Sequence, residues 1–131
     1  MKKFIYKICS KFEWSNFQKK KIFRGTKQDI ADGYIHFSDK NQVKSTLKKH
    51  FFGQDKLILL KVDTSKLENL IWEKSTGNKI FPHLYSYLIL KRVKKIYKIR
   101  LKKTVYIFFR QIIKKYLVYI ALRGPKIIIV Q

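Results

Sequence analysis

The chain has 131 residues, of which 46% are hydrophobic, and its 31 lysines and arginines against 8 aspartates and glutamates give a formal net charge of +23. This length suits one domain, and the hydrophobic content excludes a disordered basic arm, because disorder requires low hydrophobicity. No run of about 18 uncharged apolar residues occurs, so no transmembrane helix is expected. The single cysteine, Cys9, excludes an internal disulfide. Lys7 and Lys11 interrupt the apolar residues near the start, so we expect no secretory signal, and a cytoplasmic monomer.

The first third of the chain alternates a strand with two short helices. Phe4–Ile8 is apolar and aromatic, which predicts a strand. Ser10 is placed to cap a helix over residues 11–20. Thr26 and Asp29 have the spacing of a capping box, with aspartate in place of glutamate. They predict a second short helix, which the next glycine ends.

The middle of the chain predicts a strand followed by a longer helix. Tyr34–Phe37 is a short apolar segment that reads as a strand. Ser38 or Asp39 is expected to cap the next helix. From Val43 the apolar residues recur every four positions, and Gly53 is expected to close the helix.

The remaining predicted elements are mainly strands. Five of the six residues of Leu57–Val62 are aliphatic, which is typical of a buried strand. Further strands are expected at Leu70–Glu73, 94–101 and 104–109, and Phe81–Tyr85 starts extended because proline disfavours helix in the residue before it. Strands interleaved with short helices predict an α+β domain.

The basic residues are unevenly spread. There are 18 basic and 8 acidic residues up to position 90, but 13 basic and no acidic residues after it. This shift predicts one α+β domain over 1–103 and a basic, apolar extension over 104–131. Residues 104–122 have the pattern of a basic amphipathic helix. It could lie on an anionic membrane, pack on the domain or a partner, or be an end without a function.

Two pairs of residues could carry chemistry. His36 and Ser38 are two apart in a predicted strand, so they share a face and could meet one ligand. His83 and Tyr85 have the same spacing. The alternatives are a half-buried histidine bonded to backbone in the first case, and a structural corner fixed by Pro82 in the second.

A carboxylate and the absence of metal motifs complete the candidates. Glu73 follows Trp72, and a carboxylate beside an indole can have a raised pKa or hold a substrate hydroxyl. The alternative is an exposed acid on a strand. The three histidines lack the spacing of zinc ligands, and Cys9 adds little, so no metal is expected. No phosphate-binding glycine loop is present.

Short motifs along residues 3–93 occur together in a fixed order. They are Ile5–Cys9, Trp14, Phe23–Gly25, Ala31–Ser38, His50–Gln54, Leu57–Val62, Trp72–Glu73 and Phe81–Tyr85. In combination they resemble a bacterial and plant family called domain of unknown function 952.

The resemblance implies a fold similar to that of ADP-ribosyltransferases, and especially to the catalytic domain of RNA 2′-phosphotransferases. The expected architecture is a small, curved, mostly antiparallel sheet with short helices. Ile35–Ser38 resembles the His-Leu-Ser motif of those enzymes, and Ile5–Ile8 resembles their Tyr-His-Gly strand with Lys7 where histidine is usual. A charged lysine donates but cannot accept hydrogen bonds, which disfavours ordinary NAD binding but suits a phosphate.

The resemblance also implies a pocket for a nucleotide- or NAD-like ligand. Its expected catalytic residues are His36, Glu73 and His83, and its expected ligand-binding residues are Lys7, Arg24, Ser38 and Tyr85. Lys7 and Arg24 would neutralise phosphate. His36 and Ser38 would hold ribose hydroxyls, and Tyr85 would stack on a ring. The carboxylate would orient a hydroxyl or stabilise an oxocarbenium-like centre. The reaction would be transfer of ADP-ribose, with NAD as the donor, or removal of a phosphate from RNA.

Two other classes of function stay open. Basic residues interleaved with aromatic ones, such as Tyr97, Tyr106, Phe108 and Phe109, are typical of a non-catalytic protein that binds RNA. The amphipathic segment 104–122 would instead suit peripheral contact with a membrane surface.

Overall fold

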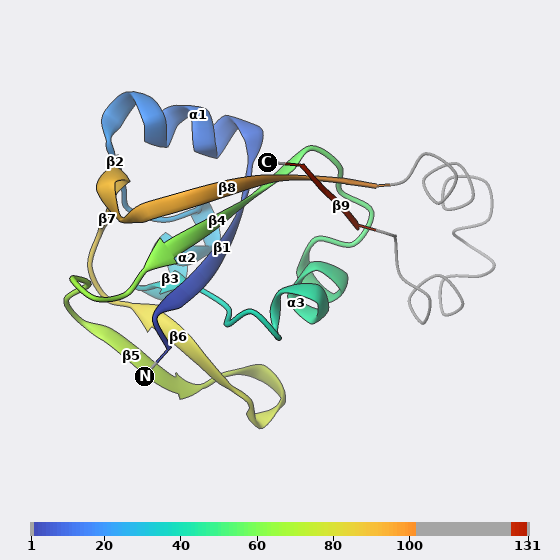
Figure 1. Ribbon diagram of the computed structural model, residues 1–131. Helices are drawn as coiled ribbons and strands as arrows, with labels where there is room; N and C mark the ends of the chain where they lie inside the picture. The colour runs from blue at the N-terminus through green and yellow to red at the C-terminus, as the bar shows by residue number, and fades with distance from the viewer. Residues whose placement is uncertain (1, 102–126, 131) are drawn as a thin grey trace.

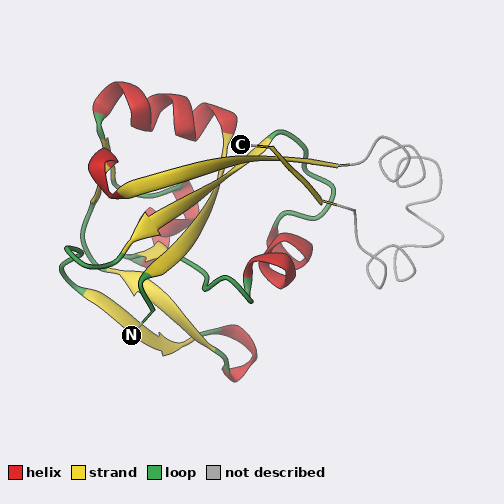
Figure 2. Ribbon diagram, viewed as in Figure 1, coloured by secondary structure: helices red, strands yellow, loops and turns green. Residues whose placement is uncertain are grey.

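The structure is a computed structural model that describes residues 2–101 and 127–130. These residues form an α+β fold with three short α-helices, and their strand pairs are antiparallel, which confirms the predicted class (Figures 1 and 2). The predicted strand at 104–109 and the predicted amphipathic helix at 104–122 lie outside the described residues. No helix in the described part of the chain is long and apolar enough to cross a membrane.

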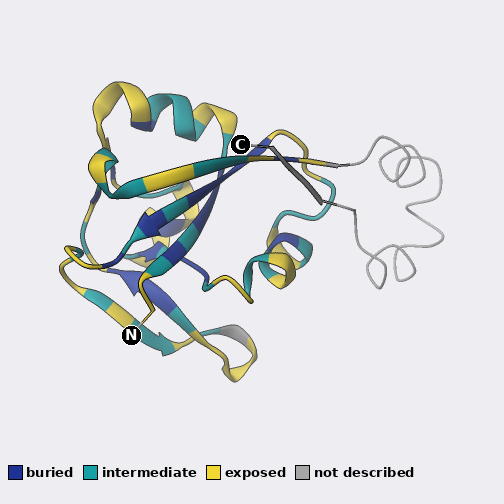
Figure 3. Cartoon of the chain, in the orientation of Figure 1, coloured by how far each residue is buried: buried dark blue, intermediate teal, exposed yellow. Residues whose placement is uncertain are grey.

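The first sheet has the strand order β1-β4-β8-β9. Its strands are β1 (Phe4–Ser10), β4 (Leu57–Asp63), β8 (Val93–Leu101) and β9 (Ile127–Val130). Strand β4 lies between β1 and β8, and apolar side chains cover both of its faces. Leu60 and Val62 are 0% exposed in one apolar cluster, while Leu57 and Leu59 belong to the other. This double burial explains the almost continuous aliphatic sequence of the strand (Figure 3).

Helix α1 (Lys11–Lys20) follows β1 directly and begins where the sequence predicts. Ser10 and Glu13 form a reciprocal capping box, in which each side chain accepts a hydrogen bond from the backbone N–H of the other. Phe17 is the buried residue of the helix, and its ring stacks on Phe23 with 5.4 Å between centroids. Phe23 lies in the two-residue strand β2 (Ile22–Phe23), which pairs with β7 (Leu88–Ile89).

The second sheet has the strand order β3-β6-β5. Its strands are β3 (Ile35–His36), β6 (Ile80–Leu84) and β5 (Leu70–Lys74), and a 3₁₀ turn, η1 (Thr76–Asn78), closes the β5–β6 hairpin. A second 3₁₀ turn, η2 (Leu90–Arg92), leads into β8. Just after β3, the backbone N–H and C=O of Ser38 both bond to Tyr6 of β1 at 2.8 Å. The segment 35–38 therefore joins the two sheets.

Helix α2 (Lys27–Asp32) is confirmed with the predicted caps. Thr26 and Asp29 form the capping box at its start, and Gly33 ends it with a φ of 87°. The glycine takes this left-handed conformation without a steric penalty.

Helix α3 (Val43–His50) shows where the prediction is wrong. The helix is flanked by Gln42 and Phe51, not by Ser38 or Asp39 and Gly53. The carboxylate of Asp39 instead accepts hydrogen bonds from the backbone N–H groups of Asn41 and Gln42 at 2.8 and 3.0 Å. The side chain of Gln42 in turn accepts from the N–H of Asp39 at 3.0 Å, so the two residues form a reciprocal pair around a turn that precedes the helix.

The thiol of Cys9 gives a simple test of the core. It is 1% exposed, and burial raises its pKa to about 12. Because the thiolate is the reactive species, we expect Ellman's reagent to leave the native protein unmodified at mildly alkaline pH. Denatured protein should react with one thiol per chain. Rapid reaction of the native protein would show that β1 is not packed as described.

Candidate functional site

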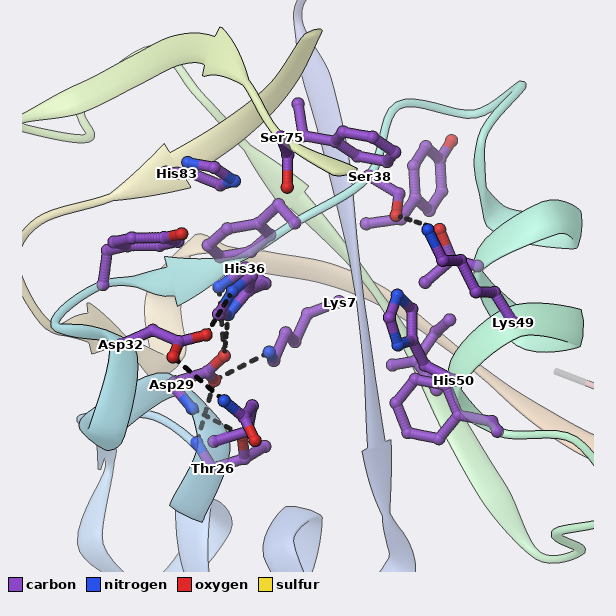
Figure 4. A pocket seen from close by; sticks show the side chains of 18 of the residues that line it. Lys7, Thr26, Asp29, Asp32, His36, Ser38, Lys49, His50, Ser75 and His83 are labelled. Atoms are coloured by element: carbon purple, nitrogen blue, oxygen red, sulfur yellow. Dashed lines mark hydrogen bonds and ion pairs between the residues drawn. The ribbon is translucent and has the colours of Figure 1, made fainter. Parts of the chain in front are cut away.

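A cavity of about 910 Å³ lies where the two sheets meet α2 and α3. Side chains from β1, α2, β3, α3 and the β5–β6 hairpin line it. Figure 4 shows that Lys7, Asp29, His36 and His83 lie around the same space. The polar residues that line it include the predicted Lys7, His36, Ser38 and His83.

Asp29 is the centre of the charged part of this site. Its side chain is 2% exposed and accepts four hydrogen bonds. Oδ2 accepts from Lys7 Nζ at 2.7 Å and from the N–H of Thr26 at 2.8 Å. Oδ1 accepts from Nδ1 and the backbone N–H of His36 at 2.6 and 3.1 Å. Burial by itself raises the pKa of Asp29, but the bonds from His36 and Lys7 outweigh it and lower that pKa well below its usual range.

Lys7 is buried because of its place in β1. Alternate residues of a strand share a face, so Lys7 points the same way as Ile5 and Cys9, which belong to the core. It is 5% exposed, and a charge so buried needs a partner of opposite sign. Asp29 supplies that partner. The resemblance assigns Lys7 to a phosphate; in the structure its ammonium group lines the cavity already paired with a carboxylate.

His36 is held between two carboxylates. Its Nδ1 lies 2.6 Å from Asp29 Oδ1, and its Nε2 lies 3.0 Å from Asp32 Oδ2. An imidazole donates to both acceptors only when each ring nitrogen carries a proton. The contact at Nδ1 is a hydrogen bond, while Nε2 and Asp32 Oδ2 lie at ion-pair distance. Asp32 lies on the solvent-facing side of His36, because its carboxylate is 35% exposed.

His83 has a carboxylate on one nitrogen only. Its Nδ1 lies 2.7 Å from Glu73 Oε1, and the hydroxyl of Tyr85 donates to the same oxygen. His83 is 2% exposed, and its Nε2 has no hydrogen-bond partner among the described residues. The ring of Tyr34 stacks on His83 with 4.1 Å between centroids. A buried ring nitrogen without a partner is destabilising, which makes Nε2 the natural contact for a ligand atom.

The pKa of Glu73 corrects one expectation. The hydrogen bonds from Tyr85 and His83 lower this pKa, whereas one of the readings left open by the sequence was that Trp72 raises it. Neighbouring residues of a strand point to opposite faces, so Glu73 and Trp72 do not share an environment. The hydrogen bond between Tyr85 and Glu73 also raises the pKa of Tyr85 to about 12.

Strand pairing in the second sheet brings these groups together. His36 lies directly opposite His83, and Glu73 lies opposite Phe81, two residues along β6 from His83. All of these side chains therefore project from one face of the sheet, together with Tyr85. The ring centroids of the two histidines are 5.5 Å apart.

Ser38 and Arg24 are the two remaining predicted residues, and only Ser38 lines the cavity. Ser38 lines the cavity and is 4% exposed, with its Oγ 3.1 Å from Thr46 Oγ1. Arg24 is not among the described residues that line the cavity, and its guanidinium lies 5.5 Å from the ring centroid of Tyr87. The structure thus groups six of the seven predicted residues in or beside the cavity and leaves Arg24 apart from it.

Sequence reasoning missed Asp29, Asp32 and Tyr34 as site residues. Asp29 was identified only as a helix cap. The signal that could have found it is Lys7 itself, since a lysine on the inward face of a strand requires a carboxylate nearby.

Basic residues also lie along the cavity. Lys27, Lys49 and Lys79 line it, are exposed, and take part in none of the ion pairs found among the described residues. We call them the rim lysines. The carboxylates Asp29 and Asp32 already face Lys7 and His36. Glu13, the third carboxylate of the lining, accepts a hydrogen bond from the N–H of Ser10, so the exposed rim lysines give the cavity a positive entrance. Among the described residues, no group of three or more histidine, cysteine, aspartate or glutamate side chains is arranged to hold a metal ion.

Comparison with known proteins gives a family model and solved structures. A family model described as "Protein of unknown function (DUF952)" matches residues 8–96. No curated protein matches the chain. The crystal structure of protein CC0527 from Caulobacter crescentus is 40% identical, with a TM-score of 0.72, over 76% of this chain and 89% of that chain. The solution NMR structure of the same protein is 40% identical, with a TM-score of 0.69, over 77% and 88% of the two chains.

Proposed function

Because the chain belongs to the family of proteins of unknown function DUF952, its activity has to be inferred from its cavity, and we propose that this cavity binds a nucleotide-like ligand. The observation that carries the proposal is the combination of exposed rim lysines with a buried histidine whose Nε2 has no described partner. The rim lysines suit a phosphate, and the Nε2 of His83 suits a ribose hydroxyl.

The remaining lining residues support the same ligand. Ser38 offers a second hydroxyl contact beside His36. The rings of Tyr6, Phe51 and Phe81 also line the cavity and are suited to contact with a base. A volume of about 910 Å³ falls in the range of small-molecule sites. In this proposal Lys7 acts through Asp29, by holding the carboxylate that orients His36.

The reaction proposed for this pocket is transfer of ADP-ribose or removal of a 2′-phosphate from RNA, on an ADP-ribosyltransferase-like fold. NAD would supply the ADP-ribosyl group. The rim lysines fit its phosphates, and His83 Nε2 fits a ribose hydroxyl. Glu73 would act from beside the pocket, through the hydrogen bond that orients His83.

Calorimetric titration tests the proposal. We expect heat of binding with at least one of NAD, ADP-ribose and a 2′-phosphorylated oligonucleotide. Replacing Lys49 or Lys79 with alanine should weaken binding about tenfold, because each removes a hydrogen bond to a charged group. Lys66→Ala is the matched control, since Lys66 is exposed but does not line the cavity. Absence of heat with all three ligands, on folded protein, would contradict the proposal.

A non-catalytic RNA-binding protein is the second candidate. The observation that favours it is β8, where Lys94, Lys95, Lys98 and Arg100 are exposed, and Lys95 Nζ lies 5.7 Å from the ring centroid of Tyr97. RNA binding through such a surface should weaken steeply with salt and be unchanged by His36→Ala. Binding in the cavity should instead be lost on His36→Ala.

A further inference from the structure

Two histidines, each with a carboxylate on its Nδ1, project from one face of the second sheet. His36 pairs with Asp29 and His83 pairs with Glu73, at 2.6 and 2.7 Å. The two rings are 5.5 Å apart between centroids, and strand pairing between β3 and β6 fixes their separation. Both rings line the cavity (Figure 4).

The two rings have different neighbours at their nitrogens. Nδ1 of His83 donates to Glu73, so its Nε2 is free to be the lone-pair nitrogen. A proton on Nε2 would be a buried donor without an acceptor, which is unfavourable. His36, in contrast, faces a carboxylate at each ring nitrogen, at 2.6 and 3.0 Å, which is the surrounding that a proton-donating imidazole needs. One ring is thus arranged as a base and the other as an acid.

From this arrangement we infer that the cavity cleaves RNA by general acid–base catalysis, with His83 as the base and His36 as the acid. The inference rests on the proposed function, because it uses the same cavity and its fit to phosphate and ribose. RNA is the substrate class because it presents a hydroxyl next to each phosphodiester, and the rim lysines and lining aromatic rings suit its phosphates and bases.

The step balances without another reactant. The ribose 2′-oxygen bonds to the adjacent phosphorus while its proton passes to His83 Nε2. The bond from phosphorus to the 5′-oxygen breaks, and that oxygen takes the proton from His36 Nε2, which leaves Asp32. The products are a 2′,3′-cyclic phosphate and a free 5′-hydroxyl, and the two histidines regain their proton states by exchange with water. Because His83 Nε2 is shielded from solvent, the substrate hydroxyl has to move a neighbouring side chain aside as it enters.

Glu73 is a positioning residue in this scheme. It touches His83 and not the substrate, and it fixes which nitrogen of the ring carries the proton. In Glu73→Gln, the nitrogen NMR signals of His83 should change from a single tautomer to a mixture, and kcat should fall more than KM changes. Glu68→Gln removes an exposed carboxylate elsewhere on the surface and is the matched control.

The experiment uses the full chain and a cytidine–adenosine RNA dinucleotide, with products separated by chromatography. We expect cytidine 2′,3′-cyclic phosphate and adenosine from the wild type. The same dinucleotide with 2′-deoxycytidine should bind in a calorimeter but stay intact. His83→Gln and His36→Gln should each slow cleavage by at least about 100-fold, the usual contribution of a general acid or base.

Each outcome decides between the two proposals. Cleavage that persists in the His36→Gln, His83→Gln double variant comes from a contaminating nuclease and overturns the inference. Binding of the deoxy dinucleotide without cleavage of the RNA overturns the inference and leaves the proposed function standing. If neither dinucleotide nor NAD, ADP-ribose or the 2′-phosphorylated oligonucleotide binds, the inference and the proposed function are both contradicted. Should one variant not fold, the other variant and the comparison of the two dinucleotides on wild-type protein still decide.

Discussion

Replacing Asp29 with asparagine is expected to destabilise the protein by about 3–5 kcal/mol, the usual effect of removing one partner of a buried ion pair. The change keeps the shape of the side chain but leaves the ammonium group of Lys7 buried without a counter-charge. Urea unfolding followed by the fluorescence of Trp14 and Trp72 measures the loss. The matched control is Asp32→Asn, which should cost less than about 1 kcal/mol because that carboxylate is 35% exposed. Equal losses in the two variants would contradict the central place given to Asp29.

The same variant has a pH signature. Folding lowers the pKa of Asp29, so the charged carboxylate contributes stability at pH values above its unfolded pKa of about 4. That contribution is lost as the pH falls from there toward the lower folded value. The difference in unfolding free energy between wild type and Asp29→Asn should therefore shrink as the solution is acidified below about pH 4. A difference that stays constant with pH would show that Asp29 is not charged in the folded protein.

Replacing Gly25 with alanine is expected to cost about 3 kcal/mol or more, from two causes that add. Gly25 has a φ of +120°, which an L-residue adopts only under strain of about 1–3 kcal/mol. A Cβ at this position would also lie 2.6 Å from Cβ of Asp29, and overpacking of this kind costs about 1–3 kcal/mol. Because Asp29 is held by four hydrogen bonds, it cannot simply move aside.

Gly33→Ala separates the two causes. Gly33 has a φ of +87°, but a Cβ there would meet nothing within 4 Å. Its replacement should cost only the conformational strain, about 1–2 kcal/mol. Thermal unfolding of both variants measures the difference. If Gly33→Ala were the more harmful of the two, the close contact between Gly25 and Asp29 would be wrong.

Local signals in the sequence predicted much of the fold. The N-caps of helices α1 and α2 were predicted, because a cap depends on residues only three apart, although Glu13 was not recognised as the partner of Ser10. Strand β4 was predicted because it is aliphatic along nearly its whole length. The start of α3 was wrong because Asp39 can stabilise either a helix or a turn, and the choice depends on contacts that a local pattern does not contain.

The candidate site could be predicted only in part. The spacing of His36 and Ser38 suggested shared surroundings, and both residues line the cavity, as does His83. The pairing of His36 with His83 could not be predicted, because it depends on strands far apart in the chain. Arg24 was assigned by resemblance alone, and the structure places it over Tyr87 outside the cavity lining.

The short segment 35–38 has a mechanical consequence. Its Phe37 N–H donates a hydrogen bond to the carbonyl of Pro82 in β6, and its Ser38 backbone bonds to β1 of the other sheet. His36 and Ser38, on either side of Phe37, both line the cavity. The same stretch of backbone thus connects the two sheets and lines the cavity. A ligand that contacts both side chains would act as a clamp across this joint, since whatever binds the closed form opposes its opening. A protein with a ligand in the cavity would then be more rigid than the empty protein.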